Sequence, residues 1–305
     1  MGVKIQDIIR TFSLTIHTEG SQDLQIAENE LNRSGLQLAG FYGYFAENRI
    51  QILGKAEISY LNSLEPNNVQ EAVELLMRHN IPCIIITQNN PIPDAIIKSG
   101  NKNNIWVLST AITTTHLQVD LTLYLQNLLA EVNNYHGELL DIFGVGVLIT
   151  GKSGIGKSET ALELIKRGHL LVADDNVIIK KPSPNVLVGT GSETTTNLME
   201  IRGIGIIDIK SMFGLRAIRI QKNIEIVIQL ETWDEDSYYD RVGDKYEWTQ
   251  IMEVSLPITH VPVKAGRNLA VIIEVIALNF RQNVLGYNTA TELDEKIKML
   301  KTTVL

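Results

Sequence analysis

Cysteine is nearly absent from this chain of 305 residues, because Cys83 is the single one. It cannot form an internal disulfide, and it lies in the apolar stretch of residues 81–87, so we expect a buried thiol in a reducing compartment. Basic residues are also fewer than acidic ones, with 27 Lys and Arg against 35 Asp and Glu, which gives a formal net charge of −8. Proteins that bind nucleic acid usually carry an excess of basic residues, so no nucleic-acid partner is expected.

Long apolar runs are missing as well. No stretch of the sequence reaches the roughly 18–20 apolar residues that are needed to cross a bilayer, so no membrane partner is expected. The first apolar cluster is interrupted by Lys4, Gln6, Asp7 and Arg10, which is unlike the apolar core of a signal peptide. We therefore expect a cytoplasmic protein.

What the chain does contain is typical of a soluble globular protein, with 44% hydrophobic and 20% charged residues. Its length exceeds the size at which one hydrophobic core usually suffices, so two domains are expected. We place the boundary near residue 130, because the chemically informative motifs begin just after it. The prediction is an α/β protein with an N-terminal α/β domain, residues 1–130, and a C-terminal domain, residues 131–305.

The N-terminal half alternates helical and strand patterns. Residues 69–79 have helical apolar spacing and are followed at once by the strand pattern of residues 81–87. A second strand is expected at residues 105–109, reached through a polar loop at residues 101–104. No phosphate loop, metal-ligand spacing or nucleophile constellation occurs in this half, so its role stays open.

Residues 114–135 are predicted to form a helix that links the two halves. Their leucines and valine recur at steps of three and four, at Leu117, Leu121, Leu125, Leu128, Leu129 and Val132. Further along, the apolar pattern of residues 268–279 predicts a helix buried against another element or subunit.

A phosphate-binding loop is the strongest motif in the sequence. The β-branched run of residues 144–150 predicts a buried strand, and residues 159–167 have helical spacing. Between them the pattern G-x-x-x-x-G-K-[ST] is complete, formed by Gly151, Lys152, Ser153, Gly154, Ile155, Gly156, Lys157 and Ser158. Strand, glycine loop and helix thus stand in the order that a nucleotide-binding loop requires.

The residue types of this loop explain its chemistry. Glycines let several backbone N–H groups turn toward a polyphosphate, and the helix adds its positive N-terminal end. Lys157 is expected to reach the β- and γ-phosphates, and the Ser158 hydroxyl is expected to ligate Mg²⁺. A phosphate loop alone does not name a reaction, since hydrolases, kinases and switches share it.

Two adjacent carboxylates, Asp174 and Asp175, end the strand pattern that begins at His169, after Gly168 closes the helix. Adjacent residues of a strand point to opposite faces, so one carboxylate is expected to face the metal and phosphates and the other the acceptor. Which of the two faces the acceptor stays open. A solvated acidic turn is the alternative interpretation of the pair.

Four segments in order resemble motifs of the HPr kinase/phosphorylases, a bifunctional family that regulates bacterial sugar use. They are residues 135–137, which read Tyr-His-Gly, residues 200–209, which are similar to the family signature, residues 239–243, and residues 262–268. The resemblance covers roughly residues 130–280. It implies a C-terminal kinase domain with a phosphoenolpyruvate carboxykinase-like nucleotide-binding core.

The resemblance also implies an activity. ATP, or pyrophosphate, with Mg²⁺ would phosphorylate a serine of the phosphocarrier protein HPr. Inorganic phosphate would reverse the reaction and give pyrophosphate. It further implies a homohexamer.

Site roles follow from the resemblance residue by residue. Asp175 would accept the serine proton and return it in the reverse reaction, Glu200 would share Mg²⁺ with Ser158, and His136 would lie at the active site. Arg241 would bind phosphate oxygens with its planar guanidinium. The segment tied to dephosphorylation would be Pro262, Val263, Lys264, Ala265, Gly266 and Arg267.

Taken without the family, the same residues have plainer interpretations. The isoleucines of residues 200–209 would suit a buried strand, His136 a capping or surface residue, and Arg241 a salt bridge to a neighbouring acid. For the whole chain, two other functions stay open. They are a phosphate-loop kinase of a small metabolite and a nucleotide-dependent sensor without turnover.

Overall fold

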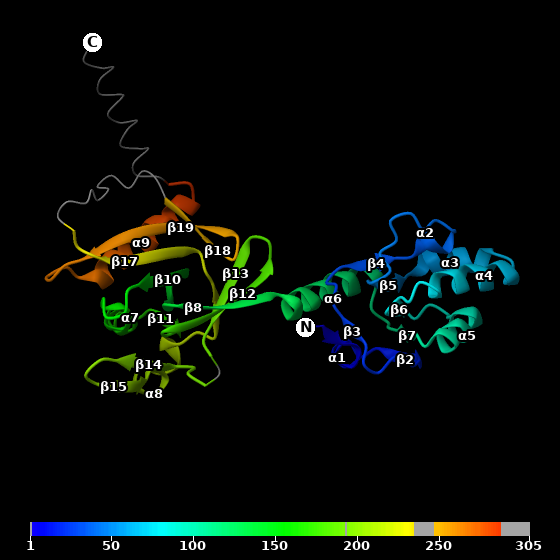
Figure 1. The fold of residues 1–305 in the computed structure, drawn as a ribbon, viewed down its shortest axis with the longest axis horizontal. Coiled ribbons are helices and arrows are strands. Elements are labelled where there is room, and N and C mark those ends of the chain that lie inside the picture. The colour runs from blue at the N-terminus through cyan, green and yellow to red at the C-terminus, as the bar shows by residue number, and fades with distance from the viewer. Residues whose placement is uncertain (1, 193, 235–246, 288–305) are drawn as a thin grey trace, which may run out of the picture. The chain divides into compact units, whose positions relative to one another are not determined.

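The computed structural model describes residues 2–192, 194–234 and 247–287, so Arg241 and the rest of residues 235–246 lie outside the described chain. The chain divides into two compact units, Met1–Ala130 and Glu131–Leu305, called here the N-terminal unit and the C-terminal unit. Each combines helices with β-sheet (Figure 1), and the predicted two-domain α/β architecture is confirmed. No helix of the described residues is both long and apolar enough to span a membrane.

The N-terminal unit is built on a five-stranded sheet of order β2-β7-β6-β5-β4, in which β4 to β7 are parallel and β2 is antiparallel to β7. Its strands are β1 (Val3–Lys4), β2 (Thr15–Thr18), β3 (Gln25–Ile26), β4 (Leu31–Arg33), β5 (Ile50–Leu53), β6 (Cys83–Ile86) and β7 (Trp106–Ser109). Its helices are α1 (Ile5–Thr11), α2 (Gly35–Leu38), α3 (Lys55–Ser63), α4 (Pro66–Met77), α5 (Asp94–Asn103) and α6 (Thr114–Leu129).

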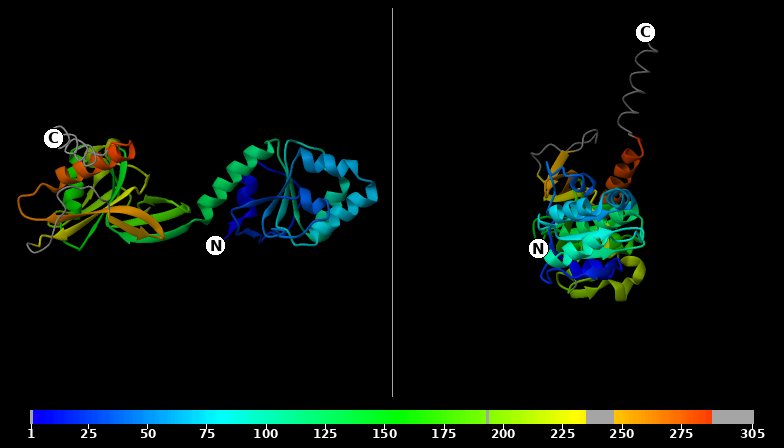
Figure 2. Two further views of the ribbon diagram at one scale, coloured as in Figure 1. Left: turned by 90° about the horizontal axis from the view of Figure 1, so that it is seen from above. Right: turned by 90° about the vertical axis from the view of Figure 1, so that its right-hand side faces the viewer.

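The apolar run at β6 shows why this sheet is covered on both faces. Cys83 and Ile85 belong to the core beneath α1 and α6, whereas Ile84 and Ile86 belong to the core beneath α3 and α4. A strand buried on both sides needs a continuous apolar sequence, which is the pattern of parallel sheets. Figure 2 shows the sheet between the two helical layers.

Two predicted boundaries in this part of the chain are wrong. Residues 101–103 are the last turn of α5 and not a loop, and the helix ends at Asn104 in a left-handed conformation (φ 54°). The predicted linking helix stops at Leu129, and residues 131–136 form the strand β8 (Glu131–His136). Val132, Asn133 and Asn134 are weak helix formers, and β8 pairs along its whole length with β12 (Asn176–Ser183).

The C-terminal unit has two main sheets. The larger has the order β11-β9-β10-β17-β19-β18 and the smaller the order β16-β13-β12-β8, and a hairpin of β14 and β15 is separate. The remaining strands are β9 (Glu138–Ile142), β10 (Val145–Gly151), β11 (Leu170–Ala173), β13 (Val186–Thr190), β14 (Leu198–Ile201), β15 (Gly205–Asp208), β16 (Gln221–Asn223), β17 (Ile226–Thr232), β18 (Glu247–Ile251) and β19 (Val254–Val263). The helices are α7 (Lys157–Lys166), α8 (Ile209–Phe213), the 3-10 helix Leu215–Ala217 and α9 (Leu269–Val284).

The six-stranded sheet is buried on both faces. On one face its side chains form a core with α7, α9 and the hairpin, through residues such as Ile149, Leu164 and Ile273. On the other face Leu148 and Val227 pack against residues of the smaller sheet such as Ile179. Strand β10, which leads to the phosphate loop, is therefore held from both sides.

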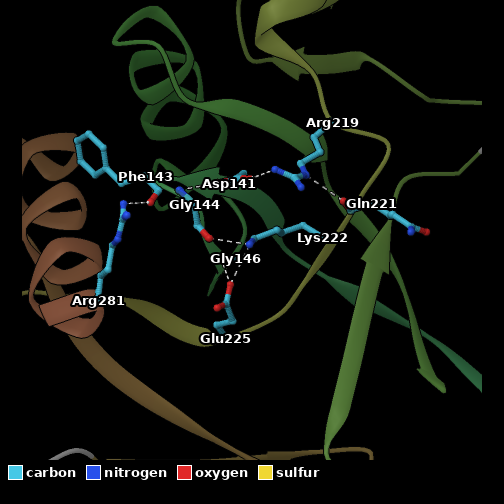
Figure 3. Close-up of polar contacts among 9 residues, drawn as sticks. All are labelled: Asp141, Phe143, Gly144, Gly146, Arg219, Gln221, Lys222, Glu225 and Arg281. Carbon is cyan, nitrogen blue, oxygen red and sulfur yellow. Dashed lines mark hydrogen bonds and ion pairs between the residues drawn. The ribbon is translucent and has the colours of Figure 1, made fainter. Parts of the chain in front are cut away.

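A polar network anchors the end of β10 that lies opposite the phosphate loop (Figure 3). The N–H of Gly144 donates to Asp141 Oδ1 (2.8 Å), and the same carboxylate pairs with Arg219. The N–H of Gly146 donates to Glu225 Oε2 (2.8 Å), and Lys222 donates to the carbonyl of Gly144 (2.6 Å). These contacts fix the tight turn between β9 and β10.

Helix α9 is longer than predicted and packs by one face only. Ala270, Ile273 and Ala277 are buried, whereas Val271 and Val275 are exposed on its other side. The predicted helix is thus present, and part of its apolar surface is exposed in the described structure.

An ion-paired contact joins α9 to the end of α7. Arg167 donates to both oxygens of Glu274 (2.9 and 2.6 Å), and His169 Nε2 lies 2.9 Å from Glu274 Oε1. Hydrogen bonds from Arg167, opposed by partial burial and assisted by His169, hold the pKa of Glu274 below its ordinary value.

Gly146→Ala is expected to destabilise the protein, because a Cβ there would lie 1.8 Å from the backbone carbonyl oxygen of Asn223. Backbone atoms cannot move aside as a flexible side chain can, so we expect a loss of about 1–3 kcal/mol, seen as a lower Tm in calorimetry. Gly35→Ala is the control, since its Cβ would come no closer than 3.5 Å to any atom. An unchanged Tm for Gly146→Ala would contradict the packing.

Glu274→Gln is expected to lower the Tm by a few degrees at pH 7, because a neutral amide binds Arg167 and His169 less strongly. The pKa of Glu274 is lower folded than unfolded, so its stabilising effect is present above its ordinary pKa of 4.5 and is lost as the pH falls through the folded value. The difference in Tm between parent and variant should therefore shrink at acid pH. Glu163→Gln, which removes an exposed ion pair with Lys166, should change little at either pH.

Candidate active site

The predicted phosphate loop connects the end of β10 to the start of α7, in the expected order of strand, loop and helix. Gly156 caps the helix with φ at 104°, a conformation that side chains with a Cβ rarely adopt. Gly154 has φ at 82°, a conformation that also favours glycine, and a Cβ there would displace the guanidinium of Arg202, which would lie 2.4 Å away. The motif glycines thus serve both the turn and the close contact.

Lys157 is buried, with 6% of its surface exposed, and its amine is held inside the loop. Its Nζ lies 3.1 Å from His136 Nε2 and donates to the carbonyl of Gly151 (3.3 Å). An ammonium group has no lone pair, so His136 Nε2 must accept this bond and the imidazole proton must lie on Nδ1. Lys157 therefore sets the tautomer of His136.

Asp175 contacts the other nitrogen of the same ring. His136 Nδ1 lies 3.0 Å from Asp175 Oδ1 and 3.1 Å from its carbonyl oxygen. Both side chains are more than half exposed, so this pair adds little stability and mainly orients the two groups. Asp175 has a left-handed backbone (φ 60°), an uncommon conformation that is concentrated at functional sites.

The expectation that Asp174 and Asp175 belong to a strand is wrong, because β11 ends at Ala173. The turn at Asp175, and not the alternation of a strand, separates the two carboxylates. Asp174 Oδ2 accepts the backbone N–H of Glu200 (2.9 Å), whereas Asp175 faces His136. The adjacent acids thus have different partners.

Strand register brings these segments to one edge of the sheet. Strand β9 is antiparallel to both of its neighbours, with Glu138 opposite Ile149 of β10 and Leu139 opposite Ala173 of β11. The first residue of β9 therefore lies between the ends of β10 and β11. Glu138, the phosphate loop and Asp174 meet at this edge although they are far apart in the sequence.

Glu138 is 1% exposed, and its Oε1 accepts a hydrogen bond from the Ser158 hydroxyl (3.0 Å). Its Oε2 and Asp174 Oδ1 are buried and have no hydrogen-bond partner among the described residues. Burial first, and the facing Asp174 carboxylate second, raise the pKa of Glu138 to about 9. Two carboxylates can share a hydrogen bond only when one carries a proton, so positive charge is favoured between them.

The segment that resembles the family signature is a hairpin of β14 and β15, and its interpretation as a buried strand is wrong. Ile204 and Ile206 are 70% and 71% exposed, and only Ile201 and Ile209 are fully buried. Glu200 is exposed near the end of β14. Arg202, beyond β14, donates to the Ser153 hydroxyl (2.8 Å).

These groups surround one cavity of about 220 Å³. It is lined by His136, Ser153, Gly154, Gly156, Lys157, Ser158, Glu159, Asp174, Asp175, Glu200 and Arg202. His136, Lys157, Ser158, Asp175 and Glu200, all candidates from the sequence, are thus brought together. Lys152 is exposed on the loop and Ile155 packs partly on the core, and neither lines the cavity.

The segment at residues 262–267 does not line this cavity. Pro262 and Val263 end β19, and Arg267 donates to the carbonyl of Pro262 (3.1 Å). The cations of Lys264 and Arg267 lie 4.8 and 5.8 Å from the ring centre of Trp233. Gly266 and Arg267 line a second, more open cavity of about 450 Å³, which shares Glu159 with the first.

Two residues of the site were missed in the sequence. Residues 137–140 are buried, and Glu138 is the only charged residue among them. A carboxylate in a buried segment could have signalled a function. Arg202 lies inside the hairpin motif, but only the fold shows that it reaches the phosphate loop. No group of three or more His, Cys, Asp or Glu side chains in the described chain is arranged to hold a metal ion.

The fold and the site together define a two-domain α/β protein with a glycine-rich loop between a strand and a helix and an acidic, histidine-containing cavity beside it. Two family models match the chain, HPr Serine kinase N terminus at residues 3–125 and HPr Serine kinase C-terminal domain at residues 127–297. The chain belongs to the HPr kinase/phosphorylase family. The resemblance found in the sequence is thereby confirmed, and it extends to the N-terminal half.

Two relatives agree over nearly their whole length. The HPr kinase/phosphorylase of Brevibacillus brevis is 47% identical over 294 residues, which cover 96% of this chain and 94% of the relative. That of Thermoanaerobacter sp. is 43% identical, covering 97% of each chain. A solved structure of the HPr(Ser) kinase/phosphatase from Coxiella burnetii is 35% identical and covers 53% of this chain and 98% of its own, with a TM-score of 0.48.

Arg202→Gln is expected to weaken nucleotide binding by about tenfold or more, because it removes a charge-assisted donor from the phosphate loop. Calorimetric titration with a non-hydrolysable ATP analogue measures the effect. Arg216→Gln is the matched control, since Arg216 is an exposed arginine of the neighbouring 3-10 helix that does not line the cavity. Equal affinity of parent and Arg202→Gln would show that Arg202 does not act on the bound nucleotide.

Proposed function

We propose that the chain transfers the γ-phosphoryl group of ATP to a serine of HPr and reverses this reaction with inorganic phosphate. The observation that carries the proposal is the chain of contacts from Lys157 through His136 to Asp175 in one cavity of a family member. A cation placed for phosphates and a carboxylate placed for a hydroxyl are the two groups that such a transfer needs. Pyrophosphate is a second donor that the same loop would accept.

Nucleotide binding is assigned to residues 151–158. Backbone N–H groups and the start of α7 would hold the phosphates, and Lys157 would neutralise the charge that develops on the transferred group. The exposed Arg202 guanidinium adds positive charge at the same loop. Arg241, proposed from the family resemblance to bind phosphate oxygens, lies outside the described residues.

Mg²⁺ is proposed as the cofactor, held by Ser158 and Glu200. The donor set fits a hard cation, because carboxylates line this cavity and one oxygen of Asp174 is buried without a partner among the described residues. When bound, such a cation neutralises phosphate charge. Since no protein cluster of three acidic or histidine ligands is present in the described part of the chain, phosphate oxygens and water would complete its shell.

Asp175 is proposed to accept the proton of the serine hydroxyl while the phosphoryl group moves from ATP to the serine oxygen. It is 70% exposed, as a group that meets a protein substrate must be, and His136 orients it. In the reverse direction a phosphate oxygen attacks phosphoserine, the serine oxygen leaves and takes its proton from Asp175, and pyrophosphate forms.

The segment at residues 262–267 is proposed to serve this reverse reaction. Its cavity shares the lining residue Glu159 with the first cavity, and Arg267 and Lys264 of the segment carry positive charge. We further propose a homohexamer in the cytoplasm, with neither nucleic acid nor membrane as a partner. The alternatives of a small-metabolite kinase and of a sensor without turnover are not favoured by the family.

Incubation with radiolabelled ATP and purified HPr, followed by an excess of inorganic phosphate, tests both directions. Phosphoserine should form on HPr and then disappear as pyrophosphate accumulates. A chain that labels a small metabolite and leaves HPr unlabelled would refute the proposal.

Asp175→Ala is expected to slow phosphorylation of HPr by about 10²–10⁴-fold, the usual effect of removing a general base. Affinity for a non-hydrolysable ATP analogue should stay within about twofold, since Asp175 contacts His136 and not the phosphate loop. Asp120→Asn, an exposed carboxylate of α6, is the control. Transfer by Asp175→Ala at the parent rate would show that another group accepts the proton.

A further inference from the structure

The carboxylates of Glu138 and Asp174 face each other beside the phosphate loop, and Asp174 lines the cavity while Glu138 contacts Ser158, which also lines it. Glu138 is almost completely buried, and one of its oxygens receives no hydrogen bond within the described chain. Asp174 Oδ1 is likewise buried and receives no hydrogen bond within the described chain. Buried acceptors without donors are costly, so the pair requires a ligand that supplies positive charge.

No side chain of the described residues supplies that charge. Lys157, the buried cation of the cavity, is engaged with His136 and with the carbonyl of Gly151. Arg202 contacts Ser153.

The partners that the pair does have select a class of ligand. Glu138 Oε1 holds the Ser158 hydroxyl, which leaves the lone pairs of Ser158 Oγ available for a cation. A hydroxyl and two carboxylates are oxygen donors, the type that Mg²⁺ and Mn²⁺ prefer. Glu200, by contrast, touches Asp174 through its backbone N–H, and its side chain is exposed.

We propose that Glu138 and Asp174 belong to the divalent-cation site at Ser158, with Glu138 both orienting the serine hydroxyl and providing negative charge for the cation. This inference rests on the proposed function, which supplies the nucleotide, and it assigns Glu138 a role that Glu200 does not fill. Cation binding would thus explain why a carboxylate is buried at the start of β9, which packing alone does not explain.

Electron paramagnetic resonance of Mn²⁺, whose free signal decreases on binding, tests the inference without any turnover. The full chain is titrated with Mn²⁺ in the presence of a non-hydrolysable ATP analogue. Glu138→Gln keeps an acceptor for the Ser158 hydroxyl but removes the charge, and it should weaken Mn²⁺ binding by about tenfold or more. Affinity for the analogue measured in EDTA should be unchanged, and Glu163→Gln, on the same helix as Ser158, should bind Mn²⁺ like the parent.

Mn²⁺ binding by Glu138→Gln within twofold of the parent would overturn the inference. Asp174→Asn keeps an acceptor for the Glu200 N–H and should lose Mn²⁺ affinity to the same extent. It is the variant to use if Glu138→Gln does not fold. The outcome is separate from that of the HPr assay. A parent chain that fails to phosphorylate HPr refutes the proposed function, whereas a variant that keeps its Mn²⁺ affinity refutes only the role of Glu138.

Discussion

The antiparallel placement of β9 between two strands of the opposite direction is the constraint on which the site depends. Because β9 pairs with β10 on one side and β11 on the other, its first residue lies beside the last residues of both. Glu138 thereby meets the phosphate loop and Asp174. The network at the opposite end of β9 and β10 keeps this register, because its hydrogen bonds and the close approach at Gly146 allow no slip.

In the resulting site the positive groups and the carboxylates without partners lie on different segments. The phosphate loop carries Lys157 and is contacted by Arg202, while beside it Glu138 and Asp174 each have a buried oxygen without a partner among the described residues. A folded protein keeps such groups only at a cost in stability, which is common where function sets the residue choice. On the proposed function this cost would be offset by bound phosphates and a cation, since each supplies the charge that the other part of the site lacks.

Features that depend on residues close together in the sequence could be predicted, whereas features that depend on pairing between distant strands could not. The order of strand, glycine loop and helix was predicted correctly because glycine spacing and apolar periodicity act within about twenty residues. The burial of Glu138 could not be predicted, because it results from pairing with β10 and β11. Likewise the leucine spacing of α6 continued into Val132, and only pairing with β12 makes residues 131–136 a strand. The isoleucines of the hairpin suggested a buried strand, but two of them are exposed, because apolar composition alone does not determine burial.

The two adjacent acids show how one short turn divides the chemistry. The left-handed backbone of Asp175 directs its carboxylate to the exposed His136, while Asp174 stays with the buried Glu138. On the proposed function, a proton acceptor for a protein hydroxyl must be open to a large substrate, whereas ligands for a cation work best where water is excluded. Reversibility adds a further requirement, because the same carboxylate must hold and release a proton in successive steps. An exposed carboxylate oriented by a neutral imidazole meets that requirement, and a buried one that shares its proton with a neighbour does not.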